Sequence, residues 1–167
     1  MKITRILAIV LICGLALAAS QETQPRPPKI EQKMFSVKGD QPWLNTGFRL
    51  RPKDRVTITA SGRVYFHQGV AASGVDPNGY QGEQGSYEEA WPNDYDHCFD
   101  PLRDANHAAL IAEVNNDIFF LGDNKVFNGK DGILVLGIND CTFTEDQVYY
   151  NTGQFQVIVK IEHPGNK

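Results

Sequence analysis

The segment from His67 to His107 carries most of the side chains that could do chemistry in this sequence. It is rich in Gly, Asp, Asn and aromatic residues and shows hardly any alternation of apolar and polar positions. Two carboxylates that flank a glycosidic bond are enough for glycoside hydrolysis, but acidic loop residues are more often solvated than catalytic. The sequence has no Gly-x-Ser-x-Gly elbow and no His-Glu-x-x-His pair. We therefore expect a binding protein and not an enzyme. The acidic residues that a hydrolase would draw on are Glu88, Glu89, Asp94, Asp96 and Asp100.

The length and the aromatic content of this segment favour a structured loop that bears part of a site. A connection of this length inside a compact domain is usually functional or disordered. Aromatic residues such as Trp91 and Tyr95 argue against simple disorder, because their rings gain from burial or from stacking on a ligand. The alternative for Trp91 is a cap over the core.

The N-terminus predicts export. Lys2 and Arg5 precede an uncharged apolar run over 6–17, and small residues follow at 16–20, as in a signal peptide spanning 1–20. The run is too short to span a bilayer, so we expect no membrane span in the mature chain. Removing the signal leaves 14 basic and 20 acidic residues, a formal charge of −6. No basic stripe is present to neutralise phosphates, which argues against a nucleic-acid partner. The protein is expected to be periplasmic or secreted.

Two cysteines, Cys98 and Cys141, remain in the mature chain. In an oxidising compartment one disulfide between them is the default expectation. It would close a loop of about 43 residues, worth roughly 4 kcal/mol in the chain-entropy model, and would make a nearby site rigid before a ligand arrives. The alternatives are two free thiols, or a zinc site that also uses His97 and His107. Zinc prefers ligand pairs with short spacers, and the sequence offers no second such pair.

The remaining sequence predicts short β-strands. Residues 21–32 are polar and proline-rich and indicate a spacer, followed by one domain over 33–163. Apolar and polar residues alternate over 55–60 and from Gln154 onward, which is typical of half-buried strands. Phe35 and Val37 suggest another strand, and short apolar runs lie at 109–114, 118–121 and 133–138. The pattern favours an all-β fold, a β-sandwich of jelly-roll type.

Several short segments together resemble the PA-IL-like family, the galactose-binding bacterial lectins with a galactose-binding-domain-like β-sandwich. No single segment is distinctive, but their order and spacing are more specific. The resemblance covers nearly the whole mature domain except the long loop. The segments are Trp43-Leu44-Asn45-Thr46-Gly47, Asp54 to Gly62, Ala109-Leu110-Ile111, Gly132 to Asp140, and Asn151-Thr152-Gly153-Gln154-Phe155.

The resemblance implies a lectin in which a calcium ion and two sugar hydroxyls meet at one end of the sandwich. Calcium takes six to eight oxygen ligands, so vicinal hydroxyls can replace two waters. Asp140 matches the family's calcium carboxylate, Asn151 matches an amide ligand, and Phe66 falls where the family offers a backbone carbonyl. Tyr150 departs from the family's Asp or Asn, so Glu145 or Asp146 would have to substitute.

Each implied ligand also has a plainer interpretation. Asp140 and Asn151-Thr152-Gly153 are good turn formers, and the loss of a ligand at Tyr150 keeps open a sandwich that serves as an envelope or adhesion module without a sugar site. Lectins often gain avidity by forming homo-oligomers. Sugar contacts away from the metal would come from the long loop, and the candidates are Trp91, Tyr95, His97 and His107.

Overall fold

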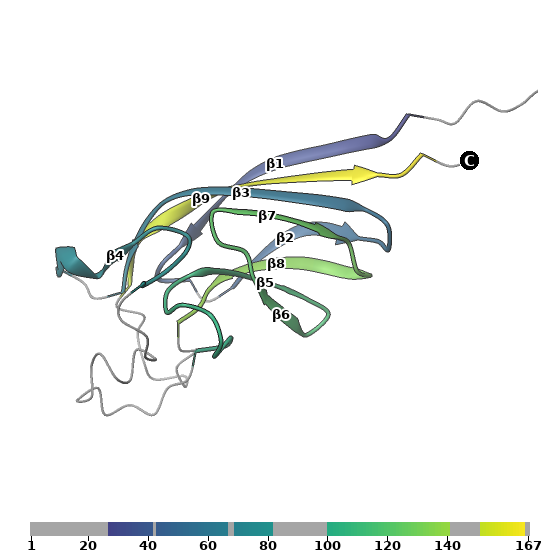
Figure 1. Ribbon diagram of the computed structural model, residues 1–167. Helices are drawn as coiled ribbons and strands as arrows, with labels where there is room; N and C mark the ends of the chain where they lie inside the picture. The colour runs from purple at the N-terminus through teal and green to yellow at the C-terminus, as the bar shows by residue number, and fades with distance from the viewer. Residues whose placement is uncertain (1–26, 42, 67–68, 82–99, 141–150, 166–167) are drawn as a thin grey trace, which may run out of the picture.

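The computed structural model describes residues 27–41, 43–66, 69–81, 100–140 and 151–165. These residues form two antiparallel sheets that pack face to face, so the predicted all-β sandwich is confirmed (Figure 1). The elements are β1 Lys29–Lys38, β2 Trp43–Leu50, β3 Arg55–Tyr65, the short 3-10 turn η1 Ala71–Ser73, β4 Gly74–Val75, β5 Leu110–Val114, β6 Asp117–Phe120, β7 Asn124–Asn128, β8 Gly132–Ile138 and β9 Thr152–His163. No helix among the described residues is long and apolar enough to cross a membrane.

The first sheet is built around the long strand β3. Strand β9 pairs with β3 along its whole length and with β1 on its other side, giving the order β1-β9-β3. The opposite edge of β3 is shared by two strands, because β7 pairs with its first half and β4 with its last residues. The second sheet has the order β2-β8-β5-β6.

The core lies between the sheets and follows the alternation in the sequence. Phe155, Val157, Val159 and Ile161 on β9 are fully buried, while the residues between them are more exposed. Strand β5 is buried on both faces except at Glu113, as its continuous apolar run requires. Burial of apolar area at about 25 cal/mol per Å² is the main term that holds the two sheets together.

The first strand begins earlier than the sequence suggests. The spacer was expected to extend to Gln32, but β1 starts at Lys29, inside that range. Residues 29–32 pair with residues 160–163 of β9. The long β9 offers backbone partners there, so these residues, including the exposed Ile30, extend the sheet without contributing to the core.

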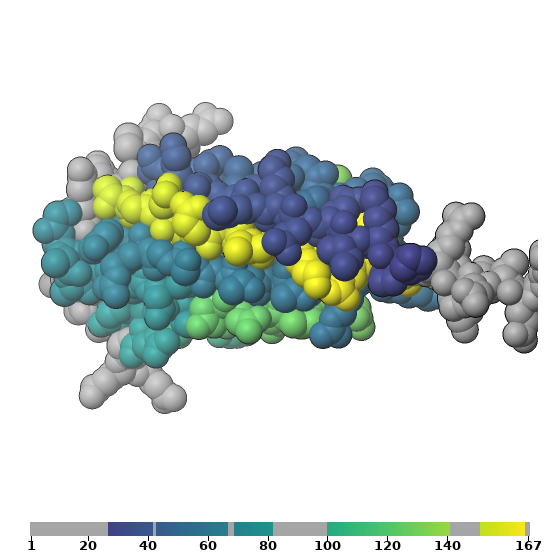
Figure 2. All heavy atoms as spheres, turned by 90° about the horizontal axis from the view of Figure 1, so that it is seen from above, coloured from purple at the N-terminus to yellow at the C-terminus, as the bar shows by residue number. Residues whose placement is uncertain are grey.

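The outer face of the first sheet is open to solvent. Figure 2 shows β1 and β9 side by side across this face. Met34 and Ile158 are directly paired in the register and are 61% and 38% exposed.

Four strands begin or end at the same end of the sandwich. Strand β3 ends at Tyr65, which pairs with Thr152 at the start of β9. Strand β8 ends at Ile138, which pairs with Leu110 at the start of β5. This end of the sandwich is remote from the pairing of Lys29 with His163 (Figure 1), and it carries the candidate site.

Candidate functional site

Asp140 and Asn151, separated by a chain segment outside the described residues, meet at this end of the sandwich. Asp140 follows β8 and Asn151 precedes β9. The Asn151 amide nitrogen Nδ2 donates a hydrogen bond to Asp140 Oδ2. The two residues are only 7% and 5% exposed. The fold therefore brings a carboxylate and an amide into one buried polar contact.

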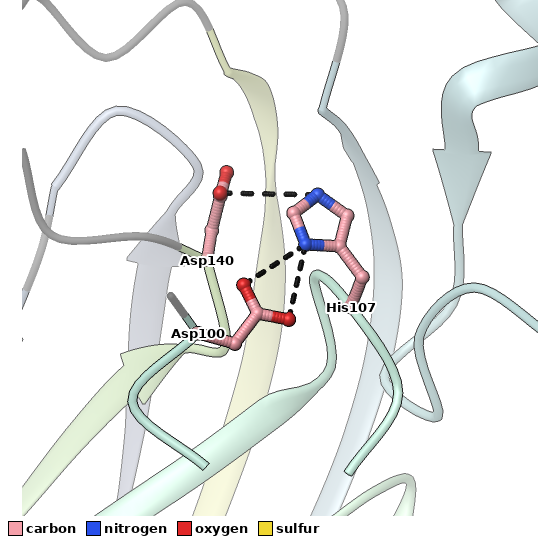
Figure 3. A group of neighbouring side chains, drawn as sticks. All are labelled: Asp100, His107 and Asp140. Atoms are coloured by element: carbon pink, nitrogen blue, oxygen red, sulfur yellow. Dashed lines mark hydrogen bonds and ion pairs between the residues drawn. The ribbon is translucent and has the colours of Figure 1, made fainter. Parts of the chain in front are cut away.

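His107 lies between two carboxylates, as Figure 3 shows. Its Nδ1 is 3.1 and 3.2 Å from the two carboxylate oxygens of Asp100. Its Nε2 points at Asp140 Oδ1, 3.8 Å away. The side chain of His107 is 6% exposed, against 18% for Asp100 and 9% for Asp140. One ligand atom from each residue lies within 4.8 Å of the others.

Aromatic rings form the apolar side of this cluster. Phe66, which directly follows β3, packs edge-on against the His107 ring with centroids 5.0 Å apart. Tyr80 packs against Phe66 in the same manner at 5.6 Å. Rings against one face of the imidazole exclude water from that side and limit how the ring can turn. Phe66 thus lies beside the cluster through its ring, whereas the family resemblance implies a role for its backbone carbonyl.

Asn139 fixes the turn that carries Asp100 and His107. It is fully buried, and its Oδ1 accepts a hydrogen bond from the backbone N–H of Leu102 at 2.9 Å. Its Nδ2 donates to the carbonyl oxygens of Leu102, Ala105 and Asn106. A turn has no ladder partners of its own, so a buried amide side chain supplies them.

The backbone of His107 is held from the other side by residues near Gly79. The N–H of Tyr80 donates to the His107 carbonyl at 2.8 Å. Gly79 has a positive φ of +80°, and a Cβ there would lie 2.7 Å from the His107 carbonyl oxygen. Glycine is required for both reasons.

A shallow hollow adjoins Asn151. Its volume is about 290 Å³, and its walls carry an ammonium, a carboxylate and two amides. Gly39 lies close against the backbone of Thr152, and a Cβ at this position would be 2.9 Å from the Thr152 carbonyl oxygen. Glycine therefore allows the two segments that line the hollow to lie this close together. The lining residues are Lys38, Asp40, Asn151, Thr152, Gly153 and Gln154.

The donor set around Asp140 combines oxygen with nitrogen. A carboxylate and an amide oxygen suit a hard cation such as calcium, so Asp140 and Asn151 fit the ion that the family resemblance implies. The imidazole nitrogen of His107 beside Asp140 is a softer donor, which suits zinc and other first-row metals better. Chemically, the cluster can bind a divalent cation or hold an ion pair.

The structure brings together four of the residues that the sequence singled out: Asp140, Asn151, Phe66 and His107. The sequence indicates Asp100 only as a candidate catalytic acid and gives no sign that the Asn139 side chain belongs to the site. Asn139 sits directly before Asp140 at the end of an apolar run, but nothing in the sequence says that its side chain reaches Leu102. The remaining candidates, Trp91, Tyr95, His97, Cys98, Cys141, Glu145 and Asp146, and the departure at Tyr150 lie outside the described residues.

Comparison with known proteins supports the fold. A solved structure described as "EclA N-terminal domain; PllA-like lectin" is similar over 77% of this chain and 95% of its own, with a TM-score of 0.52 and 22% sequence identity. No family model and no curated protein matches the chain. This protein therefore shares its β-sandwich architecture with a lectin domain.

Proposed function

We propose that this protein binds carbohydrate at the end of the sandwich where Asp140 and Asn151 meet. The observation that carries the proposal is the side-chain contact between these two residues, one of which follows β8 and the other precedes β9. A turn former needs to bond only its own backbone. Here the carboxylate and the amide are buried against each other, and an amide turned about its last side-chain bond would present its oxygen, in place of Nδ2, to a cation on Asp140.

A divalent cation would join the protein to the sugar. Two vicinal hydroxyls can complete the shell of a calcium ion, and the stereochemistry at each carbon decides whether both reach it. The Phe66 backbone carbonyl and Glu145 or Asp146 are the further ligands that the resemblance implies. The hollow beside Asn151 offers polar groups of both charges for the remaining hydroxyls.

The family resemblance implies the type of sugar, and the sequence predicts export and a disulfide. We propose a galactose-type sugar, an exported protein that is periplasmic or secreted, and a disulfide between Cys98 and Cys141 that steadies the site. Trp91, Tyr95 and His97 are proposed contacts for the sugar rings and hydroxyls. Weak single sites would favour a homo-oligomer through avidity.

Two other functions remain as alternatives. A sandwich without a sugar site would serve as an envelope or adhesion module. A glycoside hydrolase needs two carboxylates free to face the scissile bond, whereas Asp100 and Asp140 both face His107. The other acidic candidates, Glu88, Glu89, Asp94 and Asp96, lie outside the described residues. Release of reducing sugar from a glycan would identify the hydrolase.

Thermal unfolding with a galactoside tests the proposal. A ligand that binds only the native state at 100 times its Kd stabilises it by about 2.7 kcal/mol, which raises the Tm by several degrees. We expect methyl β-galactoside to raise the Tm in calcium and to have no effect in EDTA. Absence of a shift with every sugar tried would favour the adhesion module.

A variant pair locates the site. Asp140→Asn keeps the size of the side chain but removes its charge, and we expect the calcium-linked shift to disappear. Asp131→Asn is the matched control, because Asp131 forms only an exposed ion pair with Arg49. A calcium-linked shift that survives unchanged in Asp140→Asn would show that the cation binds elsewhere.

A further inference from the structure

The separation between His107 and Asp140 is unusual for a direct contact. Nε2 and Oδ1 are 3.8 Å apart, which is too long for a hydrogen bond. Two ligand atoms about 2.1 Å from one zinc ion stand about 3.4 Å apart at the tetrahedral angle. A closure of only about 0.4 Å would place both atoms on one ion.

The imidazole ring of His107 is held on its other side, at Nδ1. Asp100 faces Nδ1 with both carboxylate oxygens at hydrogen-bond distance. A carboxylate accepts a proton there, which favours the tautomer protonated at Nδ1 and leaves the lone pair of Nε2 toward Asp140. Metal-binding histidines have this arrangement, in which a carboxylate holds one nitrogen and the metal takes the other.

We propose that His107 Nε2 and Asp140 Oδ1 bind a divalent cation that accepts nitrogen ligands, with zinc as its representative, and that Asp100 orients the imidazole. The inference rests on the cation site of the proposed function and names the metal class that this site prefers. Asn151 Nδ2 donates to the other oxygen of Asp140, which holds this carboxylate in place beside His107.

The donor types decide between zinc and calcium. Calcium sites are built from oxygen, whereas imidazole suits zinc and its first-row neighbours. A zinc ion with a neutral histidine would also balance the charges of the Asp100 and Asp140 carboxylates. The competing arrangement is an imidazolium that bridges the two carboxylates, and it predicts no metal binding.

The opposite end of the sandwich provides a control. His163 also lies between two carboxylates, with Nδ1 2.8 Å from Asp54 and Nε2 3.5 Å from Glu31. Glu31, however, also pairs with Lys29 at 2.6 Å on the surface. His163→Gln therefore changes a histidine of similar charge environment without touching the proposed site.

Calorimetric titration of the full chain with zinc alone and with calcium alone, in sugar-free buffer, tests the inference. We expect zinc to bind more tightly than calcium with one site at His107. Asp100→Asn should weaken zinc binding by about 10- to 100-fold, and His107→Gln by more than about 100-fold. His163→Gln should leave the zinc affinity within about threefold. Zinc affinity retained in His107→Gln, or lost only in His163→Gln, overturns the inference.

Nitrogen NMR of the unaltered chain keeps the test decisive if a variant fails to fold. We expect the Nε2 resonance of His107 to shift on addition of zinc and the Nδ1 resonance to stay that of a protonated nitrogen. An unshifted Nε2 at saturating zinc overturns the inference. A galactoside response in calcium without zinc binding removes this inference alone, whereas zinc bound at His107 without any sugar response removes the proposed function.

Discussion

The side chain of Asn139 forms hydrogen bonds with both the backbone N–H and the backbone carbonyl of Leu102. Asn139 Oδ1 accepts from the Leu102 N–H at 2.9 Å, and Nδ2 donates to the Leu102 carbonyl at 3.0 Å. An amide side chain thus pairs with a peptide unit as a neighbouring strand would. Because Leu102 lies between Asp100 and His107, this pairing ties the geometry of the site to the end of β8.

Removing the Asn139 side chain should cost stability and ligand binding together. Asn139→Ala removes the side-chain partner of the Leu102 N–H and of the Ala105 carbonyl, while the Leu102 and Asn106 carbonyls keep the backbone N–H groups of Ala105 and Ala109. An unsatisfied buried polar group costs about 1–3 kcal/mol. We expect the free energy of unfolding in urea to fall by about 2–4 kcal/mol. Asn124→Ala, at an exposed position of β7, is the control and should change it by less than about 0.5 kcal/mol.

Gly79→Ala should be more damaging than the same change at Gly47. Both glycines have a positive φ, +80° and +74°, but a Cβ at Gly79 would strike the His107 carbonyl whereas nothing lies within 4 Å of one at Gly47. The strain of positive φ is common to both variants, so the difference in unfolding free energy reports the clash. We expect a difference of about 1–3 kcal/mol, together with weaker ligand binding in Gly79→Ala only. Equal losses of unfolding free energy in the two variants would mean that the His107 carbonyl moves away from the new Cβ at no cost.

Asp54 should contribute to stability far from the site. This residue is only 1% exposed. Its carboxylate accepts a hydrogen bond from the Arg51 N–H at 2.8 Å, and its other oxygen lies 2.8 Å from His163 Nδ1. Asp54→Ala removes the partner of the Arg51 N–H and one of the two carboxylates beside His163, which keeps Glu31. We expect a loss of about 1–3 kcal/mol in the free energy of unfolding. Sugar binding by the folded fraction should be unaffected, since Asp54 lies at the opposite end of the sandwich. A loss of less than 1 kcal/mol would contradict the role assigned to this pair.

Glu31 should add a small, salt-sensitive term to acid stability. The hydrogen bond from Lys29 holds the pKa of Glu31 below its ordinary value of 4.5; partial burial offsets some of this, and the charges of Lys29 and His163 lower it further. A carboxyl whose folded pKa is lowered stabilises the protein above its unfolded pKa and loses that contribution as the pH falls. Because the pair is exposed, we expect less than about 1 kcal/mol. Unfolding measured between pH 5 and pH 3 should be less pH-dependent in Glu31→Gln, and the difference should shrink in 1 M salt.

The sequence predicts the framework because strand signals are local. Alternation over 55–60 and from Gln154 marks β3 and β9, and the apolar runs mark β5, β6 and β8. The start of β1 is missed because residues 29–32 have no buried apolar face and join the sheet through their pairing with β9. The local sequence of residues 29–32 does not indicate this pairing.

The candidate site is harder to predict from the sequence than the fold, because its contacts join residues that are far apart in the chain. Asp140 and Asn151 are suggested by family resemblance, and the contact between them depends on β8 ending and β9 beginning at the same end of the sandwich. The pairing of Asp100 with His107 and the hold of Asn139 on Leu102 depend on a turn that has no periodic signal. Residue types identify candidate donors, whereas the fold decides which donors face each other.

A glycan array with the unaltered chain and with Asp140→Asn, each in calcium and in EDTA, tests the central claim most directly. We predict that the unaltered chain binds glycans with terminal galactose-type sugars in calcium, and that EDTA or Asp140→Asn abolishes the signal. An array on which the unaltered chain binds no glycan, or on which Asp140→Asn binds the same glycans equally well, would contradict a carbohydrate site at Asp140 and Asn151.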